Sequence, residues 1–272
     1  YAMQNTFTDV NQLAEAFVFN NYNSLFKGNS ELENQLNHNF RLNFFSFNMF
    51  NYTNIFAAIN YNKKSNQIRN RLNPLAGSIN QVSSPFNSNF EDETLTFNGR
   101  LEKTIGDIKG SLGANFNYSK FNQFVREEVN INETFTQNYR SKFSSNFDKA
   151  PNFEVGYNLR INKYNQGNNN NTFYTHSPFV NMDAYFLNGF LFSSSYTYSN
   201  YQDQERTLNK YSFLDASLSY QKGDSKWEYK LSATNLLNNK SLNRDNINVQ
   251  FTNTSEYFVQ PRYIILSIKY DL

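Results

Sequence analysis

Apolar and polar residues alternate one by one along most of the chain. The alternation is clearest over residues 112–118, 153–161, 214–220, 227–233 and 264–272. Neighbouring side chains of a β-strand point to opposite faces of its sheet, so each run predicts a strand with one apolar and one polar face. Strands in soluble proteins average about 5–6 residues, and several of the alternating runs extend well beyond that length.

The pattern changes at about residue 32. In residues 1–31 we expect a loop or a short helix leading into the sheet, with Asp9 as the N-cap of a helix over 9–19. Residues 70–89 are rich in Asn, Ser and Pro and are expected to be mostly loop, unless they hold a strand. About eleven or twelve strands are expected, over residues 36–48, 53–68, 78–87, 94–105, 108–124, 133–148, 152–166, 172–187, 190–204, 210–221, 226–237 and 256–272.

The connections between these strands alternate between short and long. The short turns fall at residues 105–107, 148–151, 187–189 and 222–225, and the long polar stretches at 124–132, 165–171, 201–210 and 238–254. Outer-membrane barrels have this asymmetry, with short periplasmic turns and long extracellular loops. We therefore predict an all-β fold, an antiparallel up-and-down transmembrane β-barrel over residues 32–272.

Composition excludes several other classes of protein. Of the 272 residues, 18% are aromatic, which argues against disorder, and the absence of cysteine excludes a disulfide scaffold. A formal net charge of +2 gives no reason to expect a nucleic-acid partner. The longest apolar runs, 55–59 and 263–266, fall far short of the ~20 residues of a membrane helix. A mean hydropathy of −0.71 suits a membrane barrel or a soluble β-sandwich, and strand length and loop asymmetry favour the membrane.

In a membrane barrel the apolar face of each strand meets lipid and the polar face meets the lumen. The residues expected to face lipid are Leu112, Ala114, Phe116, Phe153, Val155, Leu159, Leu214, Leu218, Leu231, Ile264, Leu266, Ile268, Tyr270 and Leu272. Those expected to face the lumen are Arg100, Glu102, Asn115, Arg160, Glu228, Lys230 and Lys269. Trp227 begins a strand directly after a short turn, where a residue of an interfacial aromatic girdle would lie.

The long loops are candidates for binding a ligand. Asn168, Tyr174, Tyr198 and Tyr201 lie in or beside Asn-rich, aromatic stretches that could stack on and hydrogen-bond to a sugar or a siderophore. The alternative is that these loops are only solvated.

The sequence offers no catalytic or metal-binding constellation. His38 and His176 are far apart and have no neighbouring carboxylate cluster, whereas a metal site needs several ligands. The charged residues at 127–128 and 203–206 fall in expected loops, where solvation explains them more simply than acid–base work. There is no cysteine nucleophile, no G-x-S-x-G motif and no glycine-rich phosphate loop. We predict that the chain is not an enzyme and binds neither a metal nor a cofactor.

Five short segments, taken together in their order and spacing, resemble a known family of proteins. They are residues 28–33 (GNSELE), 38–40 (HNF), 50–57 (FNYTNIFA), 233–239 (ATNLLNN) and 260–263 (QPRY). Together with the alternating last strand, they resemble the C-terminal barrel region of TonB-dependent outer-membrane receptors. The closer likeness is to the "outer membrane β-barrel family" receptors typical of Bacteroidetes, and it covers residues 28–272.

The resemblance implies a barrel of about 22 strands filled by an N-terminal plug domain. At roughly twenty residues per strand with its connection, about 22 strands need well over ~400 residues. The resemblance therefore favours the C-terminal portion of a larger receptor over a complete barrel of about twelve strands. One departure concerns the final position, which is usually aromatic in such barrels. Here it is Leu272, with Tyr270 two residues earlier on the same face.

The resulting expectation is an integral protein of the bacterial outer membrane that serves TonB-dependent uptake of a nutrient, such as a glycan or a siderophore. Its partners would be outer-membrane lipid, the plug domain and TonB. Two alternatives stay open. The chain could be a barrel subunit of a larger secretion or surface assembly, bound to a surface lipoprotein or another assembly partner and without transport of its own. It could also be a soluble glycan-binding β-protein.

Overall fold

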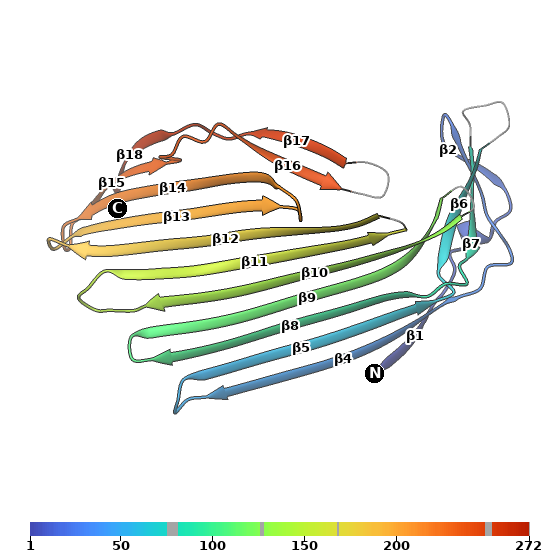
Figure 1. Cartoon of the computed structure of the whole chain (residues 1–272), viewed down its shortest axis with the longest axis horizontal. Coiled ribbons are helices and arrows are strands. Elements are labelled where there is room, and N and C mark those ends of the chain that lie inside the picture. The colour runs from blue at the N-terminus through green and yellow to red at the C-terminus, as the bar shows by residue number, and fades with distance from the viewer. Residues whose placement is uncertain (75–80, 126–127, 168, 248–251, 272) are drawn as a thin grey trace.

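A computed structural model describes residues 1–74, 81–125, 128–167, 169–247 and 252–271. In this part of the chain, twelve strands form one large antiparallel sheet, and most of them pair with the next strand along the chain (Figure 1). In spatial order the strands are β1 (Ala2–Thr6), β4 (Gln35–Asn48), β5 (Thr53–Ser65), β8 (Asp92–Ile105), β9 (Ile108–Val125), β10 (Glu128–Ser145), β11 (Asn152–Gln166), β12 (Asn169–Phe186), β13 (Phe190–Gln202), β14 (Thr207–Gln221), β15 (Trp227–Thr234) and β18 (Tyr263–Tyr270).

The large sheet confirms the all-β class, and its central strands lie within a few residues of the predicted ranges. The sheet is open, since among the described residues β1 pairs only with β4, and β18 pairs only with β15. The short strand β1 covers residues 35–39 of β4, which leaves residues 40–48 without a described partner on that side. The described residues therefore form a curved wall and not a closed barrel.

A second sheet of four strands lies at one end of the large sheet (Figure 1). Its order is β2 (Phe17–Asn21), β3 (Ser24–Lys27), β7 (Gln81–Asn87) and β6 (Ile68–Pro74), and β3 runs parallel to β7. The strand expected over 78–87 is therefore present as β7 in its described residues, but it belongs to this smaller sheet. The described residues 70–74 and 81–87 are paired strand and not loop, because β6 and β7 pair with each other.

The first 31 residues combine two roles. The predicted helix is reduced to α1 (Val10–Leu13), and its N-cap is Asp9, whose Oδ1 accepts a hydrogen bond from the backbone N–H of Asn11 at 2.8 Å. The helix is short because the following residues pair as β2 and β3. Strand β1 joins the large sheet, so residue 31 is not a boundary between a leader and the sheet.

The two ends of the large sheet differ, as the spacing of turns predicted. Short turns join consecutive strands at the left end in Figure 1. The opposite end carries the smaller sheet and the hairpin of β16 (Ser241–Ile247) and β17 (Thr252–Phe258). The described residues of the stretches 124–132 and 165–171 are largely paired strand and not loop, with Val125 opposite Glu128 and Gln166 opposite Asn169. Backbone hydrogen bonds can extend an antiparallel ladder beyond the alternating region, because they do not depend on apolar side chains.

The large sheet is a single layer and encloses almost no core. Among the described residues, Phe173 and Phe179 are the buried hydrophobic side chains. A sheet in a soluble domain normally buries its apolar face against a second layer. No described element covers this sheet in that way, so its apolar face remains open.

Candidate functional site

The pairing register sorts the predicted residues onto two faces of the large sheet. Directly opposite residues of neighbouring strands share a face, and Leu231, for example, lies between Leu218 and Leu266. The described residues that were predicted to face lipid all lie on this apolar face, namely Leu112, Ala114, Phe116, Phe153, Val155, Leu159, Leu214, Leu218, Leu231, Ile264, Leu266, Ile268 and Tyr270. Leu272 lies outside the described residues. Contact with lipid itself stays a prediction.

The residues predicted to face a lumen share the opposite, polar face. They are Arg100, Glu102, Asn115, Arg160, Glu228, Lys230 and Lys269. Glu228 lies opposite Lys269, and Asn115 lies between Asn98 and Asn138. That this face lines a lumen also stays a prediction.

The side chains of the apolar face are exposed, and this face has a long stretch without charge. Leu112 on β9 is 55% exposed, and Leu266 on β18 is 66% exposed. On β9 this face carries no charged residue from Ile108 to Tyr118, and Lys120 follows. These roughly ten residue steps of ~3.3 Å measure ~33 Å along the strand, or ~23 Å of depth at a tilt of ~45°. Outer-membrane barrels have an apolar band of about 25 Å.

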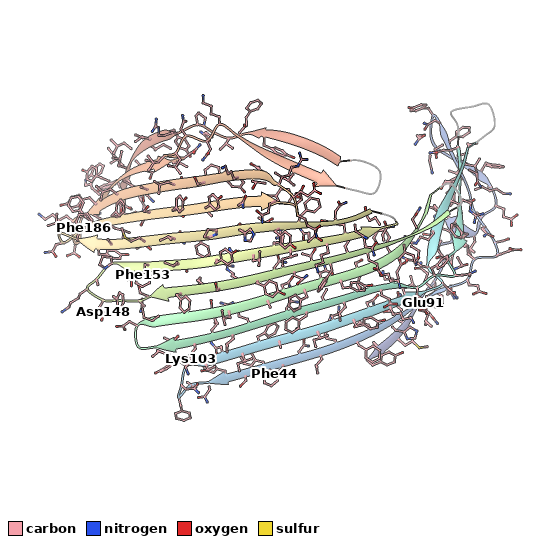
Figure 2. All side chains as sticks on the ribbon, viewed as in Figure 1. Phe44, Glu91, Lys103, Asp148, Phe153 and Phe186 are labelled. Carbon is pink, nitrogen blue, oxygen red and sulfur yellow. The ribbon has the colours of Figure 1, made fainter. Side chains whose placement is uncertain are left out.

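Aromatic rings gather on the apolar face at the short-turn end. The ring centroids of Trp227 and Tyr270 are 4.7 Å apart, those of Phe190 and Tyr220 are 4.5 Å apart, and those of Phe186 and Phe190 are 5.6 Å apart. Figure 2 shows Phe186 at this end of the sheet. Tyr and Trp are enriched where a membrane meets water, because their rings are apolar and their N–H or O–H groups are polar. We name these five residues the aromatic girdle.

Charged residues bound the same face at the other end. They form a row of alternating charge across β5, β8, β9 and β10, which we name the charged belt: Lys63, Glu93, Lys120 and Glu133. The Tyr61 hydroxyl donates a hydrogen bond of 3.2 Å to Glu93. The Tyr118 hydroxyl donates one of 3.2 Å to Glu133. Opposite charges directly across a strand pair are favourable, so the belt ends the apolar band at one height on four strands.

Sequence reasoning missed the charged belt because its members are 13 to 30 positions apart and only the register aligns them. The available signal was that the alternating run of each of these four strands ends in a charged residue on its apolar side. Glu91 lies at the same end of the sheet (Figure 2) and pairs with Lys63 at 2.6 Å. The hydrogen bond from the Lys63 ammonium holds the pKa of Glu91 below its ordinary value.

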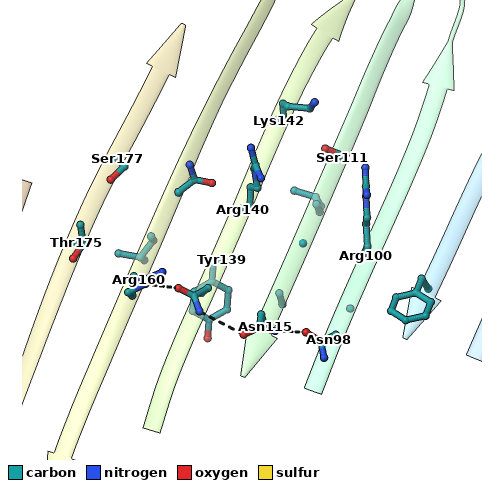
Figure 3. Close-up of a pocket in the computed structure, with 18 of the residues that line it drawn as sticks. Asn98, Arg100, Ser111, Asn115, Tyr139, Arg140, Lys142, Arg160, Thr175 and Ser177 are labelled. Carbon is teal, nitrogen blue, oxygen red and sulfur yellow. Dashed lines mark hydrogen bonds between the residues drawn. The ribbon is translucent and has the colours of Figure 1, made fainter. Parts of the chain in front are cut away.

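The polar face is hollowed over the central strands, as Figure 3 shows. The hollow has a volume of about 870 Å³. Four of its lining residues are cationic, namely Arg100, Arg140, Lys142 and Arg160, and most of the others are amides, hydroxyls and glycines. We name this hollow the basic groove.

A row of hydrogen bonds crosses the floor of the basic groove (Figure 3). Asn115 donates from Nδ2 to Asn98 Oδ1, and Asn138 donates from Nδ2 to Asn115 Oδ1 at 3.5 Å. Arg160 donates from Nε to Asn138 Oδ1 at 2.8 Å. The row joins four strands. It uses the Nε–H of Arg160, so the terminal N–H groups of that guanidinium are not part of the row.

The cations of the groove are only partly neutralised. Arg100 pairs with Glu102, which Lys109 also approaches at 3.3 Å. Lys142 pairs with Glu154 at 2.8 Å. In the described part of the chain neither Arg140 nor Arg160 forms an ion pair, and the Arg140 guanidinium lies 5.9 Å from the centroid of the Phe179 ring.

The residues predicted as ligand-binding loops do not form one site. Tyr174 lies on β12, and Tyr198 and Tyr201 lie on β13, within the strands expected over 172–187 and 190–204. Tyr174 and Tyr198 are on the apolar face, whereas Tyr201 is on the polar face and stacks on Phe173 with centroids 5.6 Å apart. Asn168 lies outside the described residues.

The histidines also lie apart, on β4 and β12. The Tyr1 hydroxyl lies 2.7 Å from His38 Nδ1, and Tyr157 and Gln202 contact His176. No group of three or more His, Cys, Asp or Glu residues that could hold a metal ion occurs within the described ranges. In the same ranges no helix has the length and apolar character required to cross a membrane.

Comparison with known proteins gives no relative from which to infer a function. No protein-family model matches the chain, and no curated protein or solved structure matches it. Any function must therefore be argued from the residues and their arrangement.

Proposed function

We propose that this chain forms part of the wall of a bacterial outer-membrane β-barrel receptor that takes up a nutrient by TonB-dependent transport. The observation that carries the proposal is the apolar face of the large sheet, bounded by the aromatic girdle at one end and by the charged belt at the other. On β9 the uncharged stretch of this face from Ile108 to Tyr118 corresponds to ~23 Å of depth at a tilt of ~45°, close to the apolar band of outer-membrane barrels. A soluble protein rarely leaves an apolar surface of this extent in water.

The two ends of the sheet suggest an orientation. Short turns are typical of the periplasmic end of such barrels, and longer connections of the extracellular end. The aromatic girdle would then lie at the periplasmic interface. The charged belt, the smaller sheet and the β16–β17 hairpin would lie toward the cell exterior.

A membrane wall must also close. Unpaired backbone N–H and C=O groups cost several kcal/mol each in hydrocarbon, so open sheet edges do not occur there. The free sides of β18 and of residues 40–48 of β4 would therefore pair with further strands. The number of strands in the closed barrel follows from the resemblance to TonB-dependent receptors alone, which gives about 22.

The polar face would then line the interior of the barrel. Its amides, hydroxyls and charges suit a hydrated path or a surface that holds a plug domain. In this reading the plug and TonB supply the energy-dependent step, and the residues described here supply the wall. No covalent chemistry is assigned to any of them.

The proposal is tested in cells that make the full protein. We expect it to fractionate with the outer membrane, to resist extraction by alkaline carbonate, and to be needed for growth on at least one scarce nutrient. The nutrients tested would include defined glycans and ferric siderophores. Release into buffer without detergent would refute the membrane wall and favour a soluble glycan-binding protein. Stable membrane insertion without any growth defect, together with a stoichiometric partner, would favour a subunit of a larger assembly.

A further inference from the structure

We propose that the basic groove is a binding site for an oxyanion, with Arg100 and Arg140 as its two arms. Arg100 and Arg140 lie directly opposite Gly113 on either side of it, on β8 and β10. Neighbouring strands are ~4.8 Å apart, so the backbones of the two arginines are ~10 Å apart. Both side chains extend along the strands on the two sides of Ser111 (Figure 3).

The small residue between the two arginines creates the space. Gly113 has no side chain, and a Cβ built there would lie 3.7 Å from the nearest heavy atom, which is an ordinary contact. The backbone of Gly113 is also outside the left-handed region, so its conformation does not require glycine. A gap of this width suits a phosphate, sulfate or carboxylate group that both guanidinium groups reach from opposite sides. Guanidinium groups bind such anions with paired N–H donors.

The charge balance favours an anion over a neutral solute. On this face of β8 to β11 the basic side chains around the gap are Arg100, Lys109, Arg140, Lys142 and Arg160, and the acidic ones are Glu102 and Glu154. Five positive charges and two negative charges leave a local balance of +3, although the whole chain carries only +2. Concave sites lined by one sign of charge concentrate ions of the other sign.

Arg140 is the arm with most capacity to bind. It forms no ion pair within the described ranges, and its guanidinium lies over Phe179 at 5.9 Å. That ring in turn covers Gly156, where a Cβ would clash with it. Arg140 is therefore positioned by an aromatic surface and not by a carboxylate, which leaves its N–H donors for a ligand. Lys142, two residues along β10, adds a third positive charge beside Ser111 (Figure 3).

The site itself follows from these residues whether or not the sheet spans a membrane. The further step, that an uptake receptor with this site would prefer nutrients that carry an acidic group, rests on the proposed function. A small anion is favoured over an acidic protein segment because the two arginines flank a single residue, Gly113, and can both donate to one oxyanion. An acidic segment of a plug is the competing occupant.

Binding is measured by isothermal titration calorimetry on the full protein in detergent at low ionic strength. The probes are inorganic pyrophosphate, sulfate and citrate, with a neutral disaccharide for comparison. We expect saturable binding of at least one anion, no binding of the disaccharide, and weakening as salt is added. Absence of saturable anion binding would overturn the proposal.

Two pairs of variants locate the site. Arg140→Gln should weaken binding at least about tenfold, because a charge-assisted hydrogen bond is lost, whereas Lys230→Gln, on the same face outside the groove, should leave it unchanged. Gly113→Val should fill the gap and abolish binding without changing charge, whereas Gly113→Ser should retain it. Equal loss in Arg140→Gln and Lys230→Gln, or unchanged binding in Gly113→Val, would overturn the proposal. Fractionation of the protein is a separate readout, so failure of the membrane proposal is recognised independently.

Discussion

A single arginine placed at the centre of the apolar face tests whether that face meets lipid, because it changes the free energy of unfolding by a predictable amount. Ala114 lies near the middle of the uncharged stretch of β9, about six residues from Ile108 and four from Tyr118. At ~3.3 Å per residue and a tilt of ~45°, Ala114 would sit ~14 Å below one interface and ~9 Å below the other. This position is close to the midplane, where an arginine facing lipid destabilises a barrel by about 2–4 kcal/mol.

Two control variants on the same strand distinguish the effect of depth in the membrane from the effect of which face carries the charge. Ile108→Arg places the charge on the same face at the short-turn end, where the cost near an interface falls to about 0–1 kcal/mol. Asn117→Arg places it on the polar face, where Asn117 is exposed, and should cost less than about 0.5 kcal/mol. The expected order of destabilisation is Ala114→Arg, then Ile108→Arg, then Asn117→Arg.

The assay is guanidinium unfolding of the full protein in lipid vesicles, with the folded fraction read from its mobility on unheated gels. A loss of 2–4 kcal/mol lowers the folding equilibrium constant by about 30-fold to 10³-fold. Equal destabilisation by Ala114→Arg and Asn117→Arg would refute the assignment of the two faces. No measurable destabilisation by Ala114→Arg would refute the membrane-core position of β9.

Three further predictions concern single contacts. Trp227→Ala removes the ring whose centroid lies 4.7 Å from that of Tyr270. The same unfolding assay should show a loss of stability above the value of an aromatic pair, which is about 0.5–1.5 kcal/mol, because the burial of the ring is lost as well. Gly156→Val must displace the ring of Phe179 and should destabilise by about 1–3 kcal/mol, whereas a well-folded variant with unchanged stability would contradict the close approach. The carboxylate of Asp203 accepts hydrogen bonds from two backbone N–H groups in the turn after β13, which lower its pKa below the ordinary value of 3.8. The turn should therefore be fully stabilised above about pH 4 and loosened as the pH falls through the lowered pKa. The measurement is the protection factor of the Glu205 and Arg206 backbone amides in hydrogen exchange, corrected for the intrinsic pH dependence of exchange; it should fall with pH in the native protein and not in Asp203→Asn.

The alternating pattern predicted the faces of the large sheet because the period of a strand is fixed by its geometry. Leu231 and Lys230 occupy opposite faces because they are consecutive residues of one strand. The pattern could also place most strand limits, since Gly106 and Gly189 adopt positive φ in short turns. It could not predict β1, whose five residues are all exposed and carry little alternation.

Register was the information that the sequence lacked. Asn98, Asn115 and Asn138 are separated by 17 and 23 positions, and only the pairing of three strands brings them into one hydrogen-bonded row. The gap between Arg100 and Arg140 depends on the same alignment. The loop predictions were wrong where strands continue past their alternating residues. Backbone hydrogen bonds between strands do not require alternating apolar side chains, so the sequence pattern did not indicate these parts of the strands.

The most direct test of the membrane wall compares adjacent positions on β9. Single cysteines replace Leu112 and Ser111 in the full protein, with any native cysteine removed, and intact outer membranes are treated with a water-soluble maleimide or a lipophilic one. We expect the cysteine at 112 to react only with the lipophilic reagent. We expect the cysteine at 111 to react with the water-soluble reagent, at least once the outer membrane is made permeable. Reaction of both cysteines with the water-soluble reagent at similar rates would contradict the claim that the apolar face of this sheet lies in lipid.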